Sequence, residues 1–300
     1  MTAVRANGIV IDYEAFGPTD VVPLLLIHGF GQQSIAWSPE WIEGFTRAGH
    51  KVIAYDNRDT GLSQKLDGRI PDFAAITRAM REGKKPDAPY TLADMAADAA
   101  GLLDALGIDG AHVAGASMGG MIAQLVALNH PGKVRSLTLI FSTTGGRGLP
   151  PSSGEAHLAL TAEAPAHDRK TVIEHVLKNR RAYASKGFAP DVERSAIHIG
   201  QCYDRMYYPE GALRHWAAIL SSPARGERLH RLKVPTLVLH GTDDTLLPCA
   251  HGRHIAECIP GAEYHEIEGW GHDMPRGVIP ILHGLMLPFI EQAERGRSAA

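Results

Sequence analysis

The sequence contains only three cysteines, and no two of them form a C-x-x-C pair. Three widely spaced cysteines in 300 residues are too few for a disulfide framework and point to a reducing compartment. The sequence also lacks an apolar run of about 18 residues, which a membrane-spanning helix needs. Its first residues lack the apolar core of a signal peptide. We therefore expect a soluble, cytoplasmic protein.

Clusters of charge of one sign are missing as well. The 30 Lys and Arg residues are balanced by 33 Asp and Glu residues, and the formal net charge is −3. Without a basic patch, the chain is expected to bind neither nucleic acid nor a membrane surface. The 16 histidines form no H-E-x-x-H motif and no tight group with cysteines, so neither a metal nor another cofactor is expected.

Buried-strand patterns that alternate with helical patterns place the chain in the α/β class. Residues 21–27 (VVPLLLI) form a continuous apolar run, which suits a strand covered on both faces. Further strands are expected at 51–55, 111–116, 134–141, 236–240 and 263–267, and helices at 92–106, 117–129, 248–258 and 278–294. Asn7-Gly8 predicts an antiparallel hairpin near the start. The alternation predicts one mostly parallel, doubly wound sheet.

The stretch between residues 142 and 234 breaks this alternation. It opens with a Gly- and Pro-rich segment and continues with helical patterns, clearest at 171–184 and 211–221. A helical block inserted between strands predicts a cap over their carboxyl ends, where open α/β sheets bind ligands. We therefore divide the chain into a core of residues 1–142 and 234–300 and a cap of residues 143–233. A shorter insertion at 71–85 predicts one more helix near the mouth of the site.

Gly115-Ala116-Ser117-Met118-Gly119 matches the G-x-S-x-G motif of a nucleophile elbow. It lies where an apolar strand (AHVAGA) meets a helical pattern (SMGGMIAQLVALNH), as this motif requires. The elbow forces the serine into a strained backbone conformation, and the glycines leave room for the close approach of the chain. Ser117 is therefore the candidate nucleophile. The alternative is a serine that only caps the helix.

A serine hydroxyl needs a base within hydrogen-bond reach to act as a nucleophile. His272 follows the last expected strand in a short loop (GWGHDMP), which places it at the same edge of the sheet as Ser117. The acid is expected between the serine and the histidine in chain order. Asp243 and Asp244 both follow the strand TLVLH, and the residues alone leave either of them as the acid. Residues 142–148 contain no carboxylate, which excludes the other known position.

Acyl transfer also needs donors for the developing oxyanion. Two backbone N–H groups are expected to supply them: that of Met118, after the nucleophile, and that of Phe30, in the His28-Gly29-Phe30-Gly31 turn. The glycines allow this turn to curl. His28 fits a structural role in the turn better than the role of a second base.

Residues 56–63 (DNRDTGLS) are similar to the D-x-R-G-x-G-x-S loop of the α/β-hydrolase superfamily, with Asp59 in place of the usual glycine. Together with the elbow and the histidine loop, this segment resembles that superfamily over essentially the whole chain. The resemblance implies an α/β-hydrolase fold, and its G-x-x-D-x-x-x-P spacing selects Asp244 as the acid. Residues 93–98 (ADMAAD) and 250–272 resemble the aclacinomycin methylesterase group, whose members hydrolyse an ester on a bulky aromatic polyketide.

The expected cap contains aromatic residues that have two interpretations. Tyr203, Tyr207 and Trp216 either line a substrate pocket or form the packing core of the cap helices themselves.

The preferred function is ester hydrolysis through a covalent acyl-enzyme, with Ser117, His272 and Asp244 as a triad. By the resemblance, the substrate is a small-molecule ester or lactone of bulky shape. Carbon–carbon bond hydrolysis and cofactor-free perhydrolysis are alternatives on the same triad, and a non-enzymatic ligand receptor is a third. Dehalogenases and epoxide hydrolases are disfavoured, because their elbow nucleophile is an aspartate. The sequence leaves monomer and homodimer open.

Overall fold

The computed structural model describes residues 2–298 of the chain. They form one eight-stranded sheet in the order β1-β2-β4-β3-β5-β6-β7-β8. The strands are β1 (Thr2–Ala6), β2 (Ile9–Phe16), β3 (Pro23–Ile27), β4 (Lys51–Tyr55), β5 (Ala111–Ala116), β6 (Val134–Ile140), β7 (Thr236–Gly241) and β8 (Glu263–Ile267). The β1–β2 and β2–β4 pairs are antiparallel, and the other pairs are parallel. The mostly parallel sheet predicted from the sequence is confirmed.

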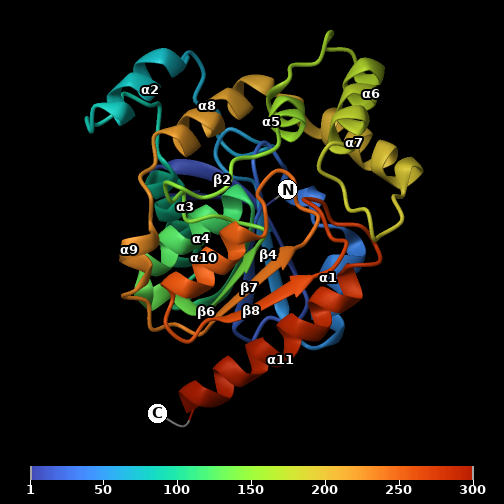
Figure 1. The fold of residues 1–300 in the computed structure, drawn as a ribbon. Helices are drawn as coiled ribbons and strands as arrows, with labels where there is room; N and C mark the ends of the chain where they lie inside the picture. Colours follow the sequence, from blue (N-terminus) through green and yellow to red (C-terminus); the bar gives the residue numbers. More distant parts are fainter. Residues whose placement is uncertain (1, 299–300) are drawn as a thin grey trace.

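Helices cover both faces of this sheet (Figure 1). They are α1 (Pro39–Arg47), α2 (Phe73–Arg81), α3 (Leu92–Ala105), α4 (Met118–Asn129), α5 (Gly154–Thr161), α6 (Arg169–Arg180), α7 (Val192–Met206), α8 (Pro209–Leu220), α9 (Gly226–Leu229), α10 (Ala250–Cys258) and α11 (Ile279–Ser298). One apolar cluster contains side chains of α3, α4 and α10, and a second contains side chains of α1 and α11. This is the predicted doubly wound arrangement. No helix within residues 2–298 combines the length and apolar character needed to cross a membrane.

Local sequence signals account for several element boundaries. Asn7 and Gly8 have φ values of 47° and 81°, as a type I′ hairpin turn requires. Thr91 and Asp94 form a capping box at the start of α3. The strand expected from residue 21 begins only at Pro23, because the side chain of Val21 is 41% exposed and lies outside the buried part of the run.

The region between β6 and β7 contains more helix than the sequence pattern indicates. α6 and α8 correspond to the two expected helices, and α5 and α7 are additional. The helix expected at 171–184 ends at Arg180, because the next three N–H groups bond to carbonyl groups three residues back, in a turn, instead of four residues back. The helix expected in the 71–85 insertion is α2.

Helices α5 to α8 lie together beyond the carboxyl ends of the strands, at the top of Figure 1. The short helix α9 instead contacts α4 and α10. Leu229 of α9 and the nearby Leu232 belong to the apolar cluster of α4. The division into a core and a cap of residues 143–233 stays a prediction, and we use the name cap below for α5 to α8 and the loops between them.

Two arginines of the cap bind carboxylates of the core. Arg214 of α8 makes a bidentate ion pair with Asp59, at 2.8 and 3.0 Å, and both side chains are buried. Asp59 has a φ of 66°, a left-handed conformation that explains why a glycine is usual at this place. Its carboxylate provides a charge that a glycine lacks. Arg205 of α7 binds Asp12 and Asp56 in the same region, so ion pairs fix two cap helices to the core.

We expect Arg214→Met to lower the free energy of unfolding by about 3–5 kcal/mol, because it leaves the buried Asp59 carboxylate without a counter-charge. Arg169→Met is the matched control. Arg169 makes the same bidentate contact with Asp204, but both side chains are about half exposed, and such a pair contributes less than about 1 kcal/mol. Urea unfolding of both variants measures the difference. Equal losses would contradict the role of burial.

Candidate active site

The carboxyl ends of neighbouring strands meet at one edge of the sheet. Ile27 of β3 lies beside Gly115 of β5, and Ile140 of β6 lies beside both Ala116 of β5 and Leu239 of β7. The loops that follow β3, β5, β7 and β8 carry predicted site residues, which are Phe30, Ser117, Asp244 and His272 respectively. The parallel register therefore brings together residues that lie far apart along the chain.

Ser117 occupies the turn between β5 and α4, with φ 56° and ψ −120°. This conformation is costly for a residue other than glycine. The flanking glycines make the turn possible: a Cβ atom on Gly115 would lie 2.2 Å from the Gly119 carbonyl oxygen, and one on Gly119 would lie 2.0 Å from the Ile27 carbonyl oxygen. The Ser117 side chain makes no capping hydrogen bond to α4. The turn has the geometry of a nucleophile elbow rather than that of a capped helix start.

His272 lies between Ser117 and Asp244. Its Nε2 is 2.9 Å from Ser117 Oγ, and its Nδ1 is 2.7 Å from Asp244 Oδ2. The neighbouring Asp243 carboxylate is instead near the hydroxyl of Thr242. Of the two adjacent aspartates, Asp244 is therefore the one that reaches the imidazole.

The side chain of Asp244 is fully buried, and several hydrogen-bond donors surround its carboxylate. Its Oδ1 accepts hydrogen bonds from the backbone N–H groups of Leu246 and Leu247, at 2.9 and 2.7 Å. His240 Nε2 lies 3.4 Å from Oδ2. Burial alone would raise the pKa of Asp244, but the charge of His272 and the hydrogen bonds of both histidines hold this pKa well below its usual range. The group is therefore a stable carboxylate that can orient an imidazole and balance its positive charge.

A cap loop between α6 and α7 holds the loops that carry the acid and the base. The His272 N–H donates to the Tyr183 carbonyl at 2.7 Å, and Thr245 Oγ1 donates to the Ala182 carbonyl at 2.8 Å. The Ser185 hydroxyl accepts a further hydrogen bond from the backbone of the His272 loop. The cap thus contributes to the position of the imidazole as well as covering the edge of the sheet.

The turn after β3 lies directly beside the nucleophile, since a Cβ atom on Gly29 would be 3.8 Å from Ser117 Oγ. Within residues 2–298 the Phe30 N–H has no hydrogen-bond acceptor. Met118 is the first residue of α4, a position whose N–H has no acceptor inside a helix. Both predicted oxyanion donors are thus close to Ser117 in sequence or space, and neither has an acceptor among the described residues. His28 is different: burial lowers its pKa to about 3, which keeps it neutral.

The three aromatic residues predicted to contact substrate occupy two different places. Trp216 packs edge-on against Phe30, with 5.9 Å between the ring centroids. Tyr203 and Tyr207 stack on each other at 4.9 Å, and both hydroxyl groups bond to His167. Trp216 therefore lies next to the predicted oxyanion turn, whereas the two tyrosines pack within the cap.

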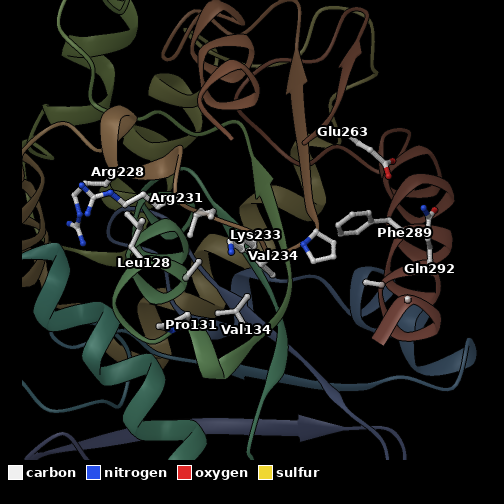
Figure 2. A pocket seen from close by; sticks show the side chains of 15 residues that line it. Leu128, Pro131, Val134, Arg228, Arg231, Lys233, Val234, Glu263, Phe289 and Gln292 are labelled. Carbon is white, nitrogen blue, oxygen red and sulfur yellow. The ribbon is translucent and has the colours of Figure 1, made fainter. Parts of the chain in front are cut away.

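A cavity of about 770 Å³ lies at the opposite edge of the sheet (Figure 2). Its walls come from the end of α4, the segment before β7 and the last turns of α11, including Leu128, Val234 and Phe289. It contains no predicted site residue. In the part of the chain that the structure describes, no group of three or more His, Cys, Asp or Glu side chains is arranged to hold a metal ion.

Three side chains that support the site were not found by sequence reasoning: His240, Ser185 and His215. His240 had a usable signal, because it ends a buried strand four residues before Asp244. Ser185 and His215 had none, because their bonds reach Gly271 and Gly31, which lie 86 and 184 residues away along the chain.

Comparisons with known proteins show what the chain is similar to. A family model described as alpha/beta hydrolase fold matches residues 22–196. A rhodomycin D methylesterase of Streptomyces peucetius is 30% identical, over 92% of this chain and 93% of that protein. A 2-hydroxy-6-oxononadienedioate/2-hydroxy-6-oxononatrienedioate hydrolase of Paraburkholderia phymatum is 28% identical, over 83% of this chain and 80% of that protein. Among solved structures, an esterase of Rhodococcus sp. ECU1013 has a TM-score of 0.73 at 25% identity, with 96% and 97% of the two chains covered.

We expect Gly119→Ala to destabilise the protein by more than about 3 kcal/mol, because the new Cβ atom would lie 2.0 Å from a backbone oxygen of β3. Gly284→Ala is the control. It lies inside α11 with nothing within 4 Å of the new Cβ atom, and it should stabilise the helix by about 0.5–1 kcal/mol. Thermal unfolding followed by circular dichroism measures both. A Gly119→Ala protein as stable as the wild type would refute the close approach.

Proposed function

Because the chain belongs to the alpha/beta hydrolase family, we propose that it is a carboxylic ester hydrolase with Ser117, His272 and Asp244 as its catalytic triad. The family match confirms the resemblance to this superfamily that the sequence predicts. One observation carries the proposal: the continuous hydrogen-bonded chain from Ser117 Oγ through the imidazole to Asp244, at 2.9 and 2.7 Å. A base held between a hydroxyl and a carboxylate at such distances is the arrangement that activates a serine.

In the proposed reaction, Ser117 Oγ attacks the ester carbonyl carbon while His272 Nε2 takes the hydroxyl proton. The tetrahedral intermediate collapses when its bond to the alkoxide oxygen breaks, and the imidazolium returns the proton to that oxygen, so an alcohol leaves. Water, deprotonated by the same nitrogen, then attacks the acyl-enzyme; the bond to Ser117 Oγ breaks, the imidazolium returns the proton to that oxygen, and the carboxylic acid leaves. Asp244 keeps the Nδ1–H tautomer and balances the imidazolium charge.

The backbone N–H groups of Phe30 and Met118 are the proposed donors to the oxyanion of both tetrahedral intermediates. Their support is position: one lies in the turn beside Ser117 Oγ, and the other is the first N–H of α4, where the positive end of the helix dipole adds to the attraction. Such a donor contributes about 3–4 kcal/mol to transition-state stabilisation.

A bulky ester or lactone is the substrate class that we propose. The Streptomyces relative is a methylesterase and the Rhodococcus relative an esterase, and both support cleavage of a C–O bond. Trp216, beside Phe30, supplies an aromatic wall for an acyl or alcohol group at this edge of the sheet. The tyrosine pair at 203 and 207 is bonded to His167, and it carries no part of this proposal.

Carbon–carbon bond hydrolysis is the second candidate, because the Paraburkholderia relative is named as a hydrolase of 2-hydroxy-6-oxo dienedioates. It would use the same three residues. Parallel assays with short-chain p-nitrophenyl esters and with a 2-hydroxy-6-oxo dienoate separate the two reactions by their rates. Peroxide-dependent perhydrolysis is tested in the same samples. A protein that shows none of these activities, and whose serine resists a fluorophosphonate probe, would be a ligand receptor instead.

We expect Ser117→Ala to lower kcat for p-nitrophenyl esters by about 10⁴-fold or more, and Asp244→Asn by about 10⁴-fold, because the asparagine favours the wrong imidazole tautomer. Asp243→Asn is the matched control, and it should change kcat by less than about threefold. Steady-state kinetics of the three variants tests the assignment. A larger loss in Asp243→Asn than in Asp244→Asn would identify Asp243 as the acid and contradict the assignment.

We expect kcat/KM to fall on the acidic side with a slope of one in a logarithmic plot against pH. The rate falls because a general base that is already protonated cannot accept the serine proton. Asp244 adds no second ionisation, since its pKa is held well below the usual carboxyl range and it stays charged throughout. A slope of two would show that a carboxylate also has to be ionised in this range, against the assigned role of Asp244.

A further inference from the structure

His215 of α8 joins the cap to the turn that carries Phe30. Its Nδ1 accepts a hydrogen bond from the Gly31 N–H at 3.2 Å, and its Nε2 donates to the Arg58 carbonyl at 2.8 Å. The side chain is completely buried, and its ring centroid lies 6.5 Å from that of Phe30. The proposed triad and oxyanion donors leave this histidine without a role.

The two hydrogen bonds define one protonation state of His215. A carbonyl oxygen can only accept, so Nε2 carries the proton, and Nδ1 must be unprotonated to accept from the Gly31 N–H. Burial lowers the pKa of His215 to about 4, which favours this neutral form. The imidazole is therefore a rigid bridge between two backbone segments rather than an acid or a base.

Gly31 follows the proposed oxyanion donor Phe30 directly. Its φ is 64°, a value that glycine adopts without strain. The bond from its N–H to His215 fixes the peptide between Phe30 and Gly31, and Trp216 packs against the Phe30 ring. Both contacts come from α8, which the buried ion pair of Arg214 anchors to the core.

We propose that His215 is a positioning residue for the oxyanion hole: through Gly31 it holds the Phe30 N–H in the orientation that the developing oxyanion needs. The inference rests on the proposed ester hydrolysis. A misaligned donor weakens binding of the transition state more than binding of the substrate, so its loss lowers kcat and leaves KM nearly unchanged. The cap thereby takes part in the chemistry without any of its side chains touching the reacting atoms.

Asparagine and glutamine at position 215 separate the two hydrogen bonds. The shorter His215→Asn places an amide oxygen near the position of Nδ1, where it can accept from Gly31. The longer His215→Gln places an amide NH₂ near the position of Nε2, where it can donate to the Arg58 carbonyl. Each variant keeps one bond and loses one, so each serves as the control for the other. We expect kcat to fall by about 10- to 100-fold in His215→Gln and by less than about threefold in His215→Asn.

Two further measurements make the result specific. Hydrogen exchange of the Gly31 amide should stay slow in His215→Asn and become fast in His215→Gln. His112→Gln alters a buried histidine that lies at the start of β5 and is bonded to Ser136 of β6. This variant should have a lower melting temperature and an unchanged kcat. Equal kcat in the Asn and Gln variants, or a loss confined to KM, would overturn the positioning role in an active enzyme. A wild type that cleaves no ester would instead overturn the proposed function together with the inference.

Discussion

The close approach of α4 to β3 and β5 at Ser117 is the constraint from which the rest of the site is built. The serine holds a left-handed backbone only because Gly115 and Gly119 have no Cβ atoms to collide with the main chain. This turn raises the hydroxyl above the sheet edge and places the first N–H of α4 beside it. The parallel register then brings the loop after β8 within hydrogen-bond reach of that hydroxyl, and the loop after β7 within reach of His272. A different strand order would leave the same residues apart.

The parts of the molecule that follow local rules could be predicted from the sequence. Strands that are apolar throughout, such as residues 23–27, and helices with clear caps were placed within a few residues. The elbow was visible because one strand–turn–helix motif contains both its chemistry and its backbone requirement. His272 and Asp244 were found through chain order and spacing, and the structure brings both to Ser117. The choice between the adjacent aspartates needed the resemblance, because side-chain direction in a loop is set by tertiary contacts.

The cap was harder to predict for the same reason. α5 has a weak apolar pattern, and the residues that bind the cap to the core pair across long stretches of chain. Asp59 illustrates the limit. A glycine is usual at this left-handed position, so the aspartate looks like a defect in the motif, yet it forms a buried ion pair with Arg214, 155 residues later. Local pattern shows that the position is unusual, and only the fold shows what compensates for it.

The cap loop after α6 holds the acid and base loops partly through two main-chain carbonyl groups, those of Ala182 and Tyr183. Main-chain acceptors are the same for every residue type, so the side chains of this loop can be exchanged without removing these two hydrogen bonds. These two contacts are independent of the sequence of the loop, whereas the ion pairs of Arg205 and Arg214 and the surface that the cap presents to a ligand depend on side chains. A cap loop held in this way can change in specificity while the imidazole keeps its place. A loop grafted from a relative would need to match the path of the backbone here more closely than the side chains of this loop.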